Sequence, residues 1–105
     1  MESEIASLQL EPAARAMESL GNPIRLTLYR HLIRAGPDGL AVGALQQRLE
    51  IPNSTLSHHI HHLMARDLVT QNREGRVLRC CANFTTMNNL LRFLTDECCV
   101  DANSC

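Results

Sequence analysis

One stretch of sequence decides the fold of this chain: Ser54-Thr55-Leu56-Ser57-His58-His59-Ile60-His61-His62-Leu63-Met64. Its large apolar residues fall within about 100° on a helical wheel, which is typical of a helix with one buried side. The opposite side is polar and carries no acidic residue. We therefore expect a helix, capped by Asn53 or Ser54 and running to about Asp67, that offers this polar side to a partner.

Three further helices are predicted before this stretch. Apolar residues recur at helical spacing through residues 10–20 and stop at a glycine, which is common just beyond a helix end. Asn22-Pro23 is typical of an N-cap followed by the first helical turn, and the helix that it opens should end at Gly36-Pro37. A short third helix fits residues 40–49, because Ile51-Pro52 interrupts the pattern.

Two short strands and a last helix are predicted after it. Residues 68–71 and 77–80 are typical of strands, and Gly75 in the connection between them suits a positive φ. The last helix should span about residues 85–99. Its apolar stripe consists of Met87, Leu90, Leu91, Leu94 and Cys98.

Helix, tight turn, helix and hairpin, in this order, predict a winged helix-turn-helix. We expect a mainly α fold with about five helices and a two-stranded wing, in a single domain over residues 1–105. An acidic arm of about residues 1–9 and a cysteine tail of about residues 98–105 should flank it.

Charge is segregated along the chain. Residues 24–79 carry eight arginines against four acidic residues, whereas both ends are acidic. All ten basic residues are arginine, the side chain that best grips phosphate and guanine. This distribution favours nucleic acid as the partner of the middle of the chain.

Several classes of protein are disfavoured by the sequence. No apolar run approaches the length of a membrane span, and the first residues do not resemble a signal peptide, so we expect a cytoplasmic protein. An odd number of cysteines, five, then favours reduced thiols over a disulfide framework. No nucleophile elbow, phosphate-binding loop or zinc-protease motif is present, so we do not expect an enzyme.

The polar side of the helix and the hairpin together predict a DNA-binding surface. Short polar side chains and histidines on a helix reach base edges and phosphates in the major groove, while arginines beside it meet flanking phosphates. The expected DNA-contacting residues are Ser54, Thr55, Ser57, His58, His61, His62, Arg73 and Arg76. Arg79 lies in the same hairpin.

Several motifs resemble the ArsR/SmtB family over roughly residues 10–95. Residues 22–26, Asn-Pro-Ile-Arg-Leu, resemble its N-P-x-R-L motif, and residues 54–60 resemble its recognition helix, S-T-V-S-H-H-L. Residues 67–69 and 73–76 resemble its G-L-V and R-x-G-R wing. The resemblance implies a homodimeric repressor, paired through its first and last helices, that leaves its operator when metal or metalloid binds. The expected dimer residues are Leu10, Met17, Leu90, Leu91 and Leu94.

The metal sites best known in that family are missing from this sequence. Residues 40–45, Leu-Ala-Val-Gly-Ala-Leu, replace both cysteines of the arsenite-binding L-C-V-C-D-L box. The zinc-type site on the last helix also fails, because no histidine follows His62. The chain most resembles a subset of arsenite sensors whose thiolates lie near the C-terminus.

Three cysteines, Cys98, Cys99 and Cys105, form the candidate effector site. Three soft thiolates suit As(III) or Sb(III). In a continuous helix the first and last would lie about 10.5 Å apart along the axis, so the helix must end near Cys99 and the tail must fold back. Cys80 and Cys81, adjacent on a strand, should point to opposite faces with one of them buried.

The sequence therefore predicts a metalloid-responsive repressor that binds double-stranded operator DNA as a homodimer and is released by As(III) or Sb(III). Three alternatives stay open: a thiol redox sensor, a Cd(II)- or Pb(II)-responsive repressor, and a DNA-binding or interaction module without an effector. Incidental cysteines in the tail would fit the last of these.

Overall fold

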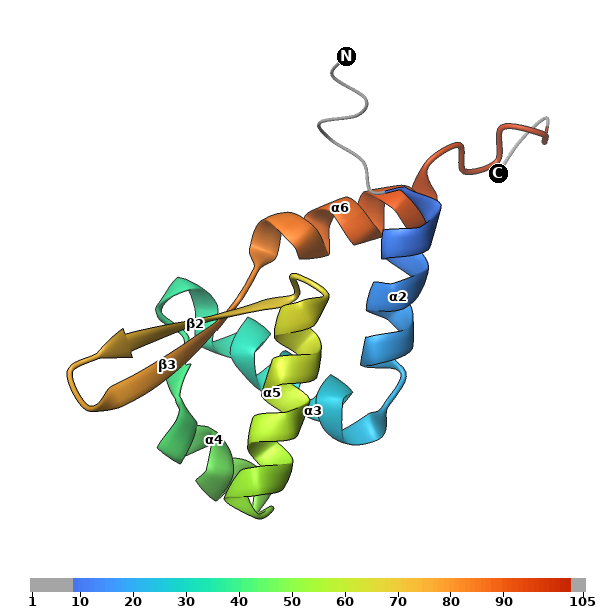
Figure 1. Ribbon diagram of the computed structural model, residues 1–105. Coiled ribbons are helices and arrows are strands. Elements are labelled where there is room, and N and C mark those ends of the chain that lie inside the picture. The colour runs from blue at the N-terminus through green and yellow to red at the C-terminus, as the bar shows by residue number, and fades with distance from the viewer. Residues whose placement is uncertain (1–8, 103–105) are drawn as a thin grey trace.

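The recognition-helix segment lies at the centre of a winged helix-turn-helix fold in the computed structural model, which describes residues 9–102 (Figure 1). Five helices and three strands are present in this part of the chain. In chain order the elements are α2 (Leu10–Leu20), α3 (Pro23–Ala35), the 3-10 turn η1 (Gly36–Asp38), β1 (Leu40–Ala41), α4 (Val42–Leu49), α5 (Asn53–Ala65), β2 (Val69–Glu74), β3 (Val77–Ala82) and α6 (Phe84–Thr95).

The start of α3 follows the sequence prediction. The side-chain oxygen of Asn22 accepts hydrogen bonds from the backbone N–H groups of Ile24, at 2.9 Å, and Arg25, at 3.1 Å. Pro23 occupies the first turn, where its missing N–H costs nothing. The helix ends at Gly36, whose φ of 81° lies in the region that favours glycine.

Two predicted helix boundaries were wrong. The residue before α5 is Pro52, in extended conformation, and no side chain caps this helix, whereas Asn53 or Ser54 was expected to do so. The last helix, α6, ends at Thr95 instead of Cys99. Glu97 and Cys99 have φ values of 60° and 62°, which no α-helix accommodates, so Cys98 and Cys99 lie in successive turns.

The wing has a third strand that the sequence did not reveal. Leu40 and Ala41 pair with Cys80 and Arg79 of β3, giving an antiparallel sheet of order β1-β3-β2. The close approach requires Gly39, with φ of 67°, because a Cβ there would collide with the Cys80 carbonyl. The wing is therefore tied to the start of α4.

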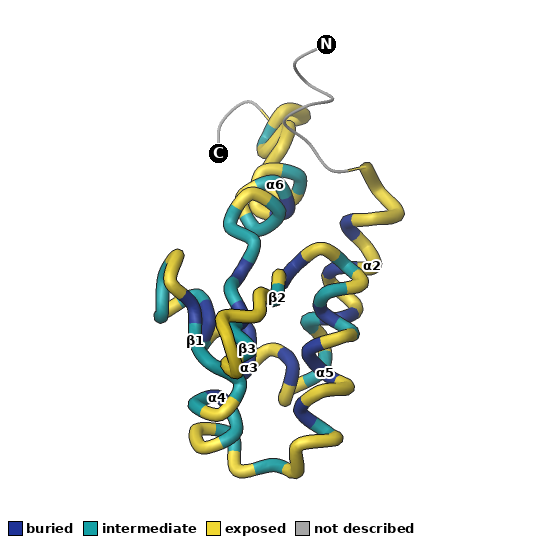
Figure 2. The backbone as a smooth tube through the Cα atoms, turned by 60° about the vertical axis from the view of Figure 1, so that its left-hand side comes forward, coloured by how far each residue is buried: buried dark blue, intermediate teal, exposed yellow. Residues whose placement is uncertain are grey.

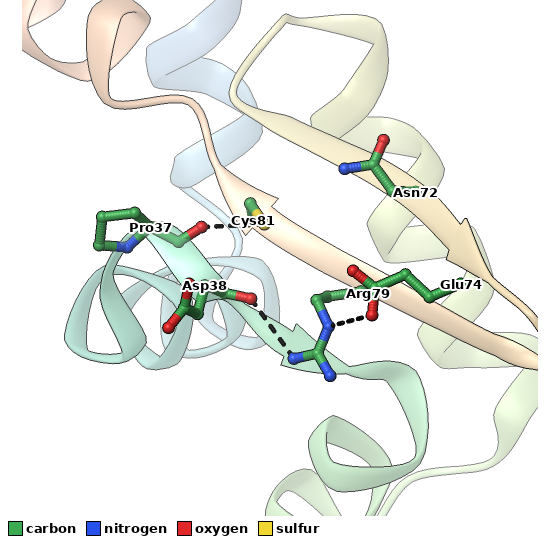
Figure 3. A pocket seen from close by; sticks show the side chains of 6 residues that line it. All are labelled: Pro37, Asp38, Asn72, Glu74, Arg79 and Cys81. Atoms are coloured by element: carbon green, nitrogen blue, oxygen red, sulfur yellow. Dashed lines mark hydrogen bonds and ion pairs between the residues drawn. The ribbon is translucent and has the colours of Figure 1, made fainter.

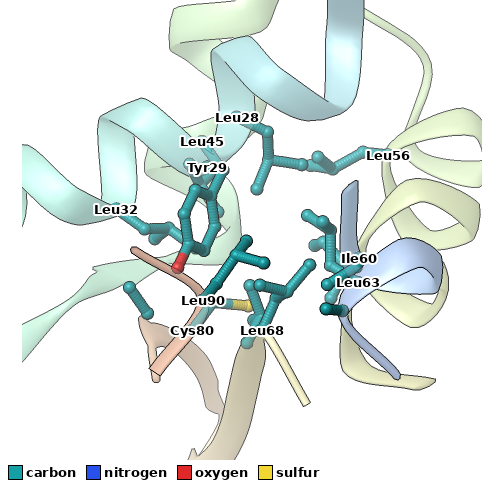
Figure 4. Close-up of a cluster of buried hydrophobic side chains, with 14 residues drawn as sticks. Leu28, Tyr29, Leu32, Leu45, Leu56, Ile60, Leu63, Leu68, Cys80 and Leu90 are labelled. Atoms are coloured by element: carbon teal, nitrogen blue, oxygen red, sulfur yellow. The ribbon is translucent and has the colours of Figure 1, made fainter. Parts of the chain in front are cut away.

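The core forms where α3, α5 and the base of the wing meet (Figure 4). Leu28 and Leu32 of α3 and Leu56 and Leu63 of α5 are completely buried. Exposed and buried residues alternate along α5, and α4 lies at the opposite end of the molecule from α6 (Figure 2). No helix among residues 9–102 is both long and apolar enough to cross a membrane.

Candidate nucleic-acid interface

The polar side of α5 is open to solvent. Ser54, Ser57, His58 and His61 are exposed, and Thr55 is half-buried. The buried side of the helix carries Leu56, His59, Ile60 and Leu63. The structure therefore presents most of the residues that we predicted to contact DNA on one accessible side.

His61 has a defined hydrogen-bonding role. Its Nδ1 lies 2.8 Å from the carbonyl oxygen of Ser57, one helical turn earlier. A carbonyl only accepts hydrogen bonds, so Nδ1 donates, and Nε2 of the neutral ring is an acceptor facing outward from this bond. Such an acceptor complements the amino groups of adenine and cytosine in the major groove.

His62 differs from the other predicted contacts because it is held by α2. Its Nδ1 lies 2.8 Å from Oγ of Ser19, a residue that is completely buried. Burial, and then the positive charge of Arg25, lower the pKa of His62. The structure thus places His62 at the junction of α2 and α5, half-buried beside the exposed side of the helix.

A buried polar network next to it was not predicted. The side chain of Arg25, 8% exposed, donates from Nε to the carbonyl oxygen of Ser19 at 2.8 Å and from Nη1 to Nδ1 of His59 at 3.3 Å. Burial, followed by the Arg25 charge, lowers the pKa of His59, which keeps the ring neutral and able to accept. The network joins α2, α3 and α5 and fixes the recognition helix against both neighbours.

A signal for this network was present in the sequence. Arg25 precedes Leu28 and Leu32 by three and seven positions, so the three share one side of α3. An arginine on the apolar side of a helix needs buried acceptors, which here come from α2 and α5.

The wing carries two kinds of arginine. Arg73 and Arg76 are exposed on either side of Gly75. Arg79 instead donates from Nε to Glu74 at 3.0 Å and from Nη1 to the carbonyl oxygen of Asp38 at 3.4 Å, across a hollow of about 420 Å³ (Figure 3). Arg73 and Arg76 are therefore open to phosphates, while Arg79, whose side chain is 33% exposed, is engaged by Glu74 and Asp38.

The candidate thiol site is partly visible. Cys98 is exposed and free, and its Sγ lies 3.5 Å from Sγ of Cys99. Cys99 is disulfide-bonded, so the expectation of reduced thiols was wrong for this residue. Cys105 lies outside the described residues, and within residues 9–102 no three His, Cys, Asp or Glu side chains are grouped to hold a metal ion. Cys80 is completely buried and Cys81 half-buried, on opposite faces of β3 as expected.

The predicted dimer residues divide into two groups. Leu10, Met17, Leu91 and Leu94 are between 46% and 70% exposed on α2 and α6, two helices that contact each other. Leu90 is 6% exposed and packs in the core of the single chain. The apolar surface available to a second copy is therefore made by the first four residues.

Known proteins match both the sequence and the fold. Residues 20–72 match the family described as Helix-turn-helix domain. The nodulation protein NolR of Rhizobium meliloti is 29% identical over 86 residues, which cover 82% of this chain and 68% of NolR.

Among solved structures, an ArsR family transcriptional regulator superimposes with a TM-score of 0.76 at 19% identity, covering 94% of this chain and 99% of its own. A homodimeric winged helix-turn-helix DNA-binding domain from Mycobacterium bovis gives 0.65 at 22% identity, covering 91% and 85%. The chain belongs to the helix-turn-helix domain family, and its fold is that of DNA-binding transcription regulators, which are not enzymes.

Proposed function

We propose that this protein is an ArsR-type repressor that binds double-stranded operator DNA as a homodimer. The observation that carries the proposal is the exposed, acid-free side of α5, flanked by Arg73 and Arg76 on the wing. The exposed apolar residues of α2 and α6 supply a surface for pairing, and the Mycobacterium bovis neighbour is itself homodimeric. A two-fold dimer implies a near-palindromic operator with half-sites about one helical turn apart.

We further propose that As(III) or Sb(III) is the effector and that Cys98, Cys99 and Cys105 bind it. The Sγ atoms of Cys98 and Cys99 lie 3.5 Å apart in the turns after α6. Cys99 is disulfide-bonded in the structure, so reduction must come first, after which the two sulfurs are close enough to share one soft ion. Those turns follow the helix that carries Leu91 and Leu94, so binding there acts on the dimer surface. Rearrangement of the two subunits then spoils the spacing of their recognition helices.

The test is a titration of the reduced protein with arsenite, followed by native mass spectrometry and by operator-binding anisotropy. We expect one As per chain and release of DNA. A release factor of about 100 corresponds to about 2.7 kcal/mol of coupling, and operator DNA must weaken arsenite binding by the same factor.

Cys98→Ser should abolish or blunt the arsenite response and keep DNA binding by the protein without arsenite. The matched control, Cys81→Ser, should release DNA on adding arsenite as the parent does. If Cys81→Ser no longer releases DNA, the assignment of the site is refuted.

A thiol redox sensor is the second candidate, favoured by the exposed, free thiol of Cys98. In that case peroxide, and not arsenite, should release the operator. The neighbouring acids Asp96, Glu97 and Asp101 disfavour a reactive thiolate, which is why we prefer the metalloid. Parallel titrations with arsenite, Cd(II), Pb(II) and peroxide separate these effectors.

A further inference from the structure

The outer side of α3 carries a cationic hollow that the DNA-binding surface does not use. Residues spaced three, four and seven apart share one side of a helix, and such a set lines a hollow of about 230 Å³. The lining residues are Thr27, Arg30, His31 and Arg34. Leu28 and Leu32, on the other side of α3, lie in the core, so this hollow faces solvent.

Positive charge gathers at this hollow. Arg48 of α4 adds its charge to those of Arg30 and Arg34. The pKa of His31 is lowered chiefly by burial and further by these three positive charges. Among residues 9–102, none of the three guanidinium groups pairs with a carboxylate. Nδ1 of His31 is buried and has no hydrogen-bond partner among the described residues. The group of side chains is therefore built to favour an anion.

An apolar hollow continues from it along the same helix. Pro23 and Ile24 of α3, with Leu49 and Ile51 from the end of α4 and the turn after it, line a second hollow of about 250 Å³. Thr27 lines both hollows, so they form one surface that is apolar at one end and cationic at the other.

We propose that this surface binds an organic anion, with its acidic head group held by Arg30 and Arg34 and its apolar chain lying over Ile24, Leu49 and Ile51. Six residues separate Ile24 from Arg30, which is about 9 Å along a helix, so a medium-chain carboxylate reaches from one hollow into the other. An inorganic anion would use the cationic end alone. A neutral apolar molecule would leave the arginines unpaired.

The surface adjoins the turn that sets the recognition helix. Ile51 lies two residues before the start of α5, and its carbonyl oxygen accepts a hydrogen bond from Nε2 of Gln46 at 3.3 Å. A ligand against Leu49 and Ile51 therefore acts on the position of α5. The surface lies on α3 and α4, apart from the exposed apolar residues of α2 and α6, so it stays open in the proposed dimer. This link to DNA rests on the proposed function, whereas the binding itself does not.

Binding is tested on the full-length, reduced, ¹⁵N-labelled protein without DNA or arsenite, using octanoate, 1-octanol and inorganic phosphate as probes. We expect octanoate to give saturable amide shifts at Ile24, Thr27 and Ile51 and to raise the pKa of His31. Octanol and phosphate should bind at least about tenfold more weakly, as should octanoate to Arg34→Gln. The matched control is Arg15→Gln, an exposed arginine of α2, which should bind octanoate like the parent.

Three outcomes overturn the site: no saturation by octanoate, equal affinity for octanol, or equal affinity of the two arginine variants for octanoate. Operator affinity with and without octanoate then tests the link to α5. Octanoate binding without any change in operator affinity refutes that link and leaves the site standing. Cys98→Ser should bind octanoate normally, so failure here is distinct from failure of the arsenite response.

Discussion

The charged side chain of Arg25 is buried and donates hydrogen bonds to two acceptors, the carbonyl oxygen of Ser19 and Nδ1 of His59. Arg25→Gln removes both donated bonds and leaves buried acceptors unpaired, which should cost about 1–3 kcal/mol of unfolding free energy. Urea denaturation measures the loss. Arg15→Gln, on the exposed side of α2, should change stability by less than about 0.5 kcal/mol. Equal losses in the two variants would mean that the network contributes nothing.

His59 makes stability depend on pH. Its pKa is lowered in the folded protein, so below the ordinary histidine value of about 6.5 the unfolded chain binds more protons than the folded one. Stability should be fully present above that value and should fall as the pH drops toward the folded pKa. The pKa values of His62 and His31 shift in the same direction and add to the slope. His59→Asn keeps an acceptor for Arg25 but does not titrate, so its stability should decline less steeply; an unchanged slope would contradict the assignment.

Single residues also show where sequence reasoning stops. Helical periodicity correctly placed Leu56, Ile60 and Leu63 in the core. It could not show that His62 turns toward Ser19, because that bond joins residues 43 positions apart. The role of Arg25 was hidden for the same reason, since its acceptors belong to other helices.

The wing is the element whose contribution to DNA affinity is most easily isolated. Arg76→Ala removes one exposed cation, so binding should weaken for every DNA sequence, and the dependence of log affinity on log salt should become shallower by roughly one unit. Fluorescence anisotropy at several salt concentrations measures both effects. Arg15→Ala is the control, and its salt slope should match the parent. A parent-like slope for Arg76→Ala would exclude a phosphate contact.

Local sequence signals predicted the order of the helices and strands better than the residues at which they begin and end. Asn22-Pro23 and Gly75 predicted a helix start and a turn, because a cap and a positive φ are decided within a few residues. The strand Leu40–Ala41 was predicted as helix, since two residues carry no periodicity and their partner lies forty positions away. The early end of α6 came from positive φ values at Glu97 and Cys99, which nothing in the local sequence signals.

For the whole molecule, the proposed assembly depends on the exposed leucines of α6. Leu91→Asp places a charge on a side chain that is 53% exposed in the single chain and buried in the proposed dimer, so it should give folded monomers with weakened operator binding. Light scattering and circular dichroism report mass and folding. Asn88→Asp, another exposed position of α6, should remain dimeric. A Leu91→Asp variant of dimer mass would contradict this interface.

The overall fold was predictable from the order of its helices and strands along the chain, and the polar side of α5 from the repeating pattern along that helix. The division of the leucines was not, since Leu90 and Leu91 are neighbours on the predicted stripe and only the packing of α6 on the core separates them. The part of the thiol site at Cys105 lies beyond the described residues and stays a prediction.

The pairing of β1 with β3 has a consequence for modularity. The helix-turn-helix family match covers residues 20–72, yet the strand that completes the sheet, Val77–Ala82, and the fully buried Cys80 lie after it. The matched segment is therefore not an autonomous folding unit, despite being the unit that sequence comparison recognises. A peptide of residues 20–72 should lack cooperative thermal unfolding, whereas a peptide of residues 9–95 should retain it. Recombination that grafts this helix-turn-helix onto another protein must carry both wing strands with it.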